Sequence, residues 1–137
     1  ESCVVDQVMG AFMFMRRRVF EKIGYFDERY FVYYEELDFS KRLKEAQGVS
    51  YFHASIQARH QGMGTTESVK AFRLFLNLSS RLKYAQKHFS YFGYLLVVFS
   101  VFPLELISRF FLLLFKGRLA EVNDLLKGYR LLLFGKK

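Results

Sequence analysis

The stretch YEELDFSKRLKEAQG, residues 34–48, carries the clearest helix signal in the chain. Acidic residues stand at its start and basic residues toward its end, which suits the charge preference of the helix dipole. Apolar residues recur near helical spacing, and Gly48 is a typical terminator. The pattern predicts a helix from about Glu35 to Ala46. It also places Asp38 and Arg42 four residues apart, close enough to pair along one helix face.

Shorter segments flank this helix on both sides. Residues 8–15 are almost wholly apolar and precede three arginines, as expected of a short buried strand that enters a turn. Residues 19–23 present one helical turn's apolar face, which Gly24 ends. Residues 49–52 and 55–59 have the composition of strands. The first half of the chain is therefore predicted to mix strands and helices.

Charge divides the 137 residues into two unlike parts. Through Val69 there are 9 Lys and Arg against 10 Asp and Glu, whereas from Lys70 onward there are 12 against 3. Such asymmetry favours an anionic partner for the second half, either nucleic acid or membrane headgroups. Hydrophobic residues make up 52% of the chain, which excludes a disordered protein. An aromatic content of 19% indicates that some apolar surface faces something other than a core.

The second half contains three helical patterns. Residues 68–88 form a basic amphipathic helix. Tyr91–Phe115 is a 25-residue apolar run whose only charges are Glu105 and Arg109. Because Pro103 interrupts it, two shorter helices at a membrane interface are expected rather than one clean span. The residues after Gly117 have the pattern of an interfacial anchor helix, and a helix packed on the domain is the alternative.

Two places hold candidate chemistry. Glu35, Glu36 and Asp38 cluster at the start of the predicted helix, either as functional carboxylates or simply as partners of the helix dipole. His60 precedes a glycine loop that contains Gly62 and Gly64. Glycines there permit positive φ or the close approach of a ligand.

Several ordered motifs together resemble a known family. They are Gly10-Ala11-Phe12 through Arg16-Arg17, Gly24-Tyr25-Phe26-Asp27-Glu28, Tyr34-Glu35-Glu36-Leu37-Asp38 with Arg42, and His60 before Gly62-Met63-Gly64-Thr65. Over about residues 6–66 the chain looks like the second half of a glycosyltransferase family 2 catalytic domain, and most like its rhamnosyltransferase-like members. The resemblance implies an α/β fold, the acceptor-side half of the GT-A fold. It also implies transfer of a sugar from a nucleotide donor with inversion.

The resemblance assigns roles to the acidic cluster. The general base falls on Glu36, which would take the proton of the acceptor hydroxyl as that oxygen attacks the anomeric carbon. Glu35 and Asp38 would flank it as substrate-binding residues, and a structural pairing with Arg42 is the other role open to Asp38.

The resemblance also implies a metal and a phosphate-binding loop. His60 matches a histidine that completes the site of a divalent cation, Mn²⁺ or Mg²⁺, although a structural histidine at the end of a strand is the alternative. Gly62 and Gly64 would belong to a loop that closes over the donor phosphates. The Asp-x-Asp motif that carries most of the metal ligation in the family does not occur in the 137 residues. We therefore expect the nucleotide-binding half to be missing and the chain alone to be inactive.

These expectations divide the chain into a C-terminal part of a catalytic domain, residues 1–89, and a membrane-associating helical tail, residues 90–137. The predicted function is inverting sugar transfer to a lipid-linked or polysaccharide acceptor in cell-surface glycan synthesis. The predicted location is the cytoplasmic face of a bacterial inner membrane, peripheral, with a transmembrane tail as the alternative. The competing function is a non-catalytic membrane-binding or interaction module. Nucleic acid is not an expected partner, because the aromatic residues do not alternate with the basic ones.

Overall fold

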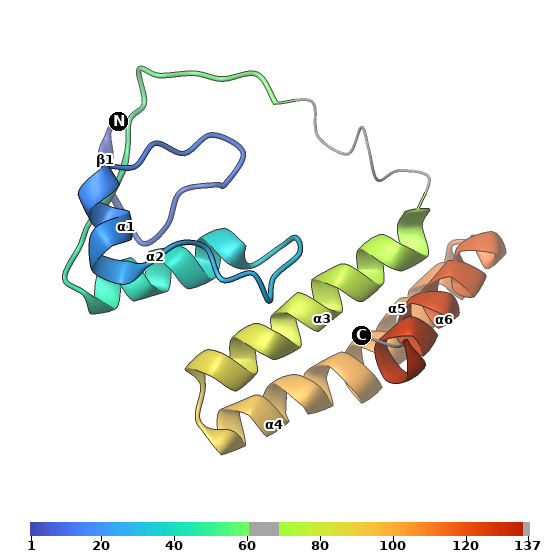
Figure 1. Cartoon of the computed structure of the whole chain (residues 1–137). Coiled ribbons are helices and arrows are strands. Elements are labelled where there is room, and N and C mark those ends of the chain that lie inside the picture. Colours follow the sequence, from blue (N-terminus) through green and yellow to red (C-terminus); the bar gives the residue numbers. More distant parts are fainter. Residues whose placement is uncertain (61–68, 136–137) are drawn as a thin grey trace. The chain divides into compact units, whose positions relative to one another are not determined.

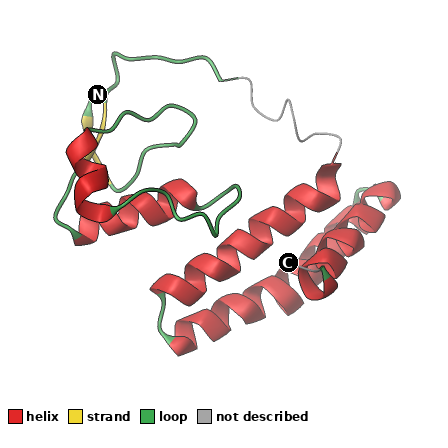
Figure 2. Ribbon diagram, viewed as in Figure 1, coloured by secondary structure: helices red, strands yellow, loops and turns green. Residues whose placement is uncertain are grey.

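The computed structural model describes residues 1–60 and 69–135. The chain forms two compact units, Glu1–Gly62 and Met63–Lys137, and each is described by itself (Figure 1). The second unit is built of helices, the first combines two helices with long loops, and the described residues contain one small sheet (Figure 2). The structure thus has a mostly helical fold with a two-stranded antiparallel sheet, and the predicted α/β half-fold is not seen.

The first unit holds two short strands and two helices. These are β1 (Cys3–Val5), α1 (Arg17–Ile23), α2 (Glu35–Glu45) and β2 (Ser50–Phe52). The strands pair antiparallel, with Cys3 opposite Phe52 and Val5 opposite Ser50. Gly24 ends α1 with φ 78° and ψ −179°, a conformation essentially restricted to glycine. The predicted helices and the strand near residues 49–52 are confirmed.

The two other predicted strands are wrong. Residues 8–15 and 55–59 lie in loops and turns. A strand needs a neighbour to accept and donate its backbone hydrogen bonds, and an apolar sequence alone does not supply one. Met9 and Phe14 in the first of these loops are exposed at 70% and 85%.

Aromatic packing around α2 forms the centre of the first unit. Phe39 is 1% exposed, and its ring lies 5.6 Å from that of Phe20 and 4.9 Å from that of Phe26. Phe20 also stacks on Tyr25 with centroids 5.1 Å apart. Lys22 Nζ donates to the carbonyl of Ala46 at 2.6 Å, which ties α1 to the end of α2. This packing fixes α2 and the acidic residues at its start.

The second unit is a set of helices. They are α3 (Lys70–His88), α4 (Tyr91–Phe99), a π-helical turn η2 (Ser100–Glu105), α5 (Leu106–Phe115) and α6 (Leu119–Phe134). Leu78, Val101, Leu125 and Tyr129 form its buried core. Gly128 permits a close approach of α6 to α3, because a Cβ there would stand 3.0 Å from the Ala71 carbonyl and from a methyl group of Leu74. These contacts therefore place α3 with the C-terminal helices, whereas the helical tail predicted from the sequence begins at residue 90.

Pro103 lies in a π-helical turn of the apolar run and does not end the helix. A proline inside a helix removes one hydrogen-bond donor, and the π-helical turn accommodates this loss between α4 and α5. The Tyr129 hydroxyl donates to the Val101 carbonyl within this turn at 2.8 Å. Tyr91–Phe115 is thus one helical stretch with a mean hydropathy of 2.0, long and apolar enough to cross a membrane, and 6% of its most apolar window is buried within the protein.

Candidate active site

Two tyrosines in a left-handed conformation introduce the acidic cluster. Tyr33 has φ 67° and Tyr34 has φ 72°, values that non-glycine residues rarely adopt. Each such residue costs about 1 kcal/mol or more, and such conformations concentrate at functional sites. The carbonyl of Tyr34 accepts the amide of Asp38 at 2.9 Å and so opens the hydrogen-bond ladder of α2. This turn sets the direction in which Glu35 and Glu36 leave the backbone.

Glu36 lies against Gly10. A Cβ built on Gly10 would stand 3.5 Å from the Cβ and 3.6 Å from the Cδ of Glu36, so the carboxylate side chain packs on the backbone of the 8–15 loop. Among the described residues, its buried Oε2 atom has no hydrogen-bond partner. A buried acceptor without a partner is costly in a protein, and a functional role is one explanation for keeping it.

Glu35 shares this environment. Its Oε2 is also buried without a partner among the described residues. Burial raises the pKa of Glu35 above its usual value, a hydrogen bond with its own backbone opposes the rise, and the charge of Glu36 adds to it. Glu35 therefore holds its proton to a higher pH than an ordinary glutamate does.

Asp38 forms a buried ion pair within α2. It is fully buried, and Arg42 Nε donates to its Oδ2 at 2.8 Å, so the predicted pairing is confirmed. The Arg42 guanidinium also donates to the carbonyls of Ile23, the last residue of α1, and of Tyr25, two residues further along the chain. The geometry supports the structural role of Asp38, and its contact with a substrate stays a prediction.

His60 is exposed at the end of the described part of the first unit. Gly62 and Gly64 lie outside the described residues. Across residues 1–60 and 69–135, no three His, Cys, Asp or Glu side chains come together in a way that would hold a metal ion. The residues described here therefore do not assemble the expected Mn²⁺ or Mg²⁺ site by themselves, and the roles of His60, Gly62 and Gly64 stay predictions.

Sequence reasoning missed two features of this site. It used Gly10 as part of a motif but not as the surface on which Glu36 packs, although a glycine within an apolar run is a known signal of close backbone approach. It also missed the left-handed Tyr33 and Tyr34, for which the sequence offers no signal, since tyrosine has no preference for that region.

Comparisons with known proteins find similarity to glycosyltransferases. Over 87 residues, 63% of this chain and 28% of the relative, the chain is 29% identical to a low-salt glycan biosynthesis hexosyltransferase of Haloferax volcanii. Over 62 residues, 45% of this chain and 20% of the relative, it is 36% identical to the N-acetylglucosaminyl-diphospho-decaprenol L-rhamnosyltransferase of Mycobacterium tuberculosis. No family model and no solved structure matches the chain. The chain is thus distantly similar to glycosyltransferases of glycan biosynthesis and spans less than a third of their length.

Proposed function

We propose that the chain is the acceptor-side part of an inverting glycosyltransferase, which moves a sugar from a nucleotide-sugar donor to a lipid-linked or polysaccharide acceptor. One observation carries the proposal. The partly buried carboxylate of Glu36, with an oxygen that has no partner among the described residues, lies at the start of α2 beside Gly10. The distant similarity to a hexosyltransferase and a rhamnosyltransferase supports the reaction class.

In this reaction Glu36 is the general base. An acceptor hydroxyl donates a hydrogen bond to the carboxylate, and its oxygen attacks the anomeric carbon of the donor sugar. The proton passes to Glu36, the new glycosidic bond forms, and the bond to the nucleoside diphosphate breaks, with the electron pair leaving on the phosphate oxygen. Attack from the side opposite the leaving group inverts the anomeric centre. A base placed this way contributes about 10² to 10⁴ in rate.

Glu35 stands next to Glu36 and would bind the substrate beside it, and burial raises the pKa of its carboxyl above the usual value. A divalent cation, Mn²⁺ or Mg²⁺, would neutralise charge on the diphosphate leaving group when bound. His60 offers it one ligand, and the other ligands would come from outside the described residues.

The first unit has the surface of an incomplete domain. Large apolar side chains are exposed on it, among them Val4, Met9, Phe14, Tyr25 and Phe31. A two-stranded sheet is only marginally stable in isolation, and exposed apolar surface of this kind marks contact with further protein. We assign that contact to a nucleotide-binding half, which would complete the α/β GT-A fold.

The second unit supplies attachment to an anionic membrane surface. Its apolar stretch Tyr91–Phe115 is largely unburied, and 12 of the 21 basic residues follow Val69. In the middle of the stretch, Glu105 pairs with Arg109 at 2.7 Å and with Arg81 of α3 at 2.5 Å. Charged groups are expensive at the centre of a bilayer. The cluster therefore favours a peripheral helix over a membrane-spanning one, and we place this helix at the cytoplasmic face of a bacterial inner membrane.

A second function stays open, that of a non-catalytic membrane-binding module. The exposed apolar side chains of α4 and α5, such as Phe92, Phe99, Phe111 and Phe115, favour membrane contact whether or not the chain takes part in catalysis. In that case Glu35 and Glu36 only complement the dipole of α2.

The test uses the protein made from the whole reading frame that contains this sequence. It is incubated with a panel of nucleotide sugars and a membrane extract as the source of acceptors, and the anomeric configuration of the product is read by NMR. We expect transfer with inversion. Retention would contradict the mechanism. Binding to vesicles without transfer from any donor would support the membrane-binding module instead.

A further inference from the structure

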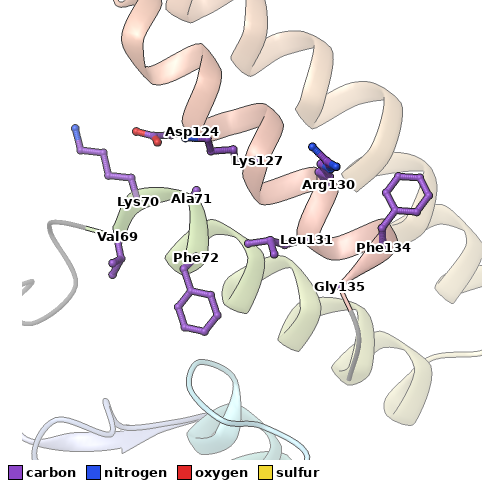
Figure 3. A pocket seen from close by; sticks show the side chains of 10 residues that line it. All are labelled: Val69, Lys70, Ala71, Phe72, Asp124, Lys127, Arg130, Leu131, Phe134 and Gly135. Atoms are coloured by element: carbon purple, nitrogen blue, oxygen red, sulfur yellow. The ribbon is translucent and has the colours of Figure 1, made fainter.

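The second unit contains a pocket of about 540 Å³ between the first turn of α3 and the C-terminal half of α6 (Figure 3). It is separate from the acidic cluster, since all of its residues belong to the second unit. Its lining comprises Val69, Lys70, Ala71, Phe72, Asp124, Lys127, Arg130, Leu131, Phe134 and Gly135.

Three of the lining residues are basic and one is acidic. Lys70 lies 3.4 Å from Glu121, an exposed and long ion pair. Lys127 and Arg130 are exposed on α6, and within residues 1–60 and 69–135 neither forms an ion pair. Asp124 offsets one of the three positive charges. The pocket therefore keeps an excess of positive charge.

Apolar side chains stand beside these cations. Phe72 on α3 and Leu131 and Phe134 on α6 line the same pocket (Figure 3). Phe134 is 77% exposed and Phe72 is 46% exposed. Cations next to exposed aromatic and aliphatic side chains match a ligand with a charged head and an apolar body, as in a lipid at a membrane interface.

We propose that this pocket binds the phosphate headgroup of an anionic phospholipid, with Lys127 and Arg130 as its main counterions. A guanidinium binds phosphate oxygens in a bidentate manner, and an ammonium adds a point charge. The apolar side chains of the lining contact the glycerol backbone and the first part of the acyl chains. A terminal phosphomonoester, as in phosphatidic acid, presents more negative charge and more free oxygens than a phosphodiester, so the pocket prefers it.

The proposal rests on the membrane attachment proposed above but not on glycosyl transfer. The test is binding of the full 137-residue chain to phosphatidylcholine vesicles that contain either phosphatidic acid or phosphatidylserine, at matched zeta potential. We expect severalfold tighter binding to phosphatidic acid, because the matched zeta potential equalises the general attraction of basic residues to the surface and leaves the direct contacts with the phosphomonoester as the difference. Equal affinity for the two lipids overturns the proposal.

Single substitutions locate the preference. Lys127→Gln and Arg130→Gln are each expected to reduce the ratio of the two affinities toward one. Lys116→Gln removes the same charge from an exposed position after α5, outside the pocket. It should weaken binding to both lipids alike and leave the ratio unchanged. A ratio that falls equally in all three variants contradicts the pocket, and circular dichroism checks that each variant keeps its helices.

Titration with inorganic phosphate, followed by calorimetry, distinguishes a pocket for a lipid headgroup from a pocket for a free phosphate ion. We expect no measurable binding at concentrations where vesicles are saturated, because the apolar contacts are missing. Binding of inorganic phosphate that Lys127→Gln and Arg130→Gln abolish would assign the pocket to a free anion and overturn the lipid. If the unsubstituted chain binds neither kind of vesicle, membrane attachment itself is overturned. This outcome differs from equal binding to both lipids, which overturns only the proposal for this pocket.

Discussion

Arg42→Met removes the side chain that ties α2 to the end of α1. Its partner Asp38 is fully buried, the Nε to Oδ2 distance is 2.8 Å, and the same guanidinium donates to two backbone carbonyls, those of Ile23 and Tyr25. Breaking a buried pair from one side costs about 3–5 kcal/mol, because the buried carboxylate loses its counterion. The two hydrogen bonds to the carbonyls contribute about 1 kcal/mol each, and we count their loss as part of the total of about 3–5 kcal/mol.

Lys41→Met is the matched control on the same helix. Lys41 pairs with Glu45 at 2.7 Å, but the Lys41 side chain is partly exposed, at 34%, and the Glu45 side chain is exposed, at 58%. Exposed pairs of this spacing contribute about 0.3–0.5 kcal/mol. Amide hydrogen exchange of α2 in the full chain is the assay. We expect the α2 amides to lose protection by about 3–5 kcal/mol in Arg42→Met and by less than about 1 kcal/mol in Lys41→Met. Equal losses in the two variants would refute the reasoning.

Three further changes test other parts of the molecule. Burial raises the pKa of Glu35 in the folded state, so its contribution to stability is present in acid and is lost as pH rises above the ordinary value of 4.5. Glu35→Gln should therefore raise the free energy of unfolding at neutral pH but not at pH about 3. A variant that is less stable than the unsubstituted protein at neutral pH would contradict this. Gly24→Ala should destabilise the first unit by about 1–3 kcal/mol, because alanine is strained at the φ of 78° that Gly24 adopts. No atom lies within 4 Å of the new Cβ, so backbone strain is the whole effect. An unchanged urea midpoint would rule this out. In the protein of the whole reading frame, His60→Ala should raise the Mn²⁺ concentration needed for transfer, and an unchanged metal titration would leave His60 a structural residue.

Helix ends were predictable because local chemistry determines them. The charge order across Glu35–Glu45 and the glycine after α1 act within one or two turns, and both predictions agree with the structure. The strand predicted at residues 8–15 failed because a strand is stable only beside another, which no local pattern guarantees. A helix break was expected at Pro103, but the structure has a π-helical turn there. The wider π-helical hydrogen-bond pattern accommodates the one backbone donor that proline lacks.

The candidate site was predictable as residue types and not as geometry. The cluster of Glu35, Glu36 and Asp38 is evident in the sequence. The four-residue spacing between Asp38 and Arg42 predicted their ion pair, in which Asp38 is buried. The contact of Glu36 with Gly10 joins segments far apart in the chain, and the left-handed turn before α2 falls on two tyrosines, which have no propensity for that region.

The most direct test of the central claim is the rate of sugar transfer by Glu36→Gln in the protein of the whole reading frame, at saturating donor. Glu28→Gln serves as the control, because Glu28 is exposed and close in sequence. The amide keeps the shape of the side chain but cannot take the proton, so we expect the rate to fall by about 10² to 10⁴ while the dissociation constant of the nucleotide sugar changes little. The control should keep its activity. Near-normal turnover by Glu36→Gln would contradict the assignment of Glu36 as the general base.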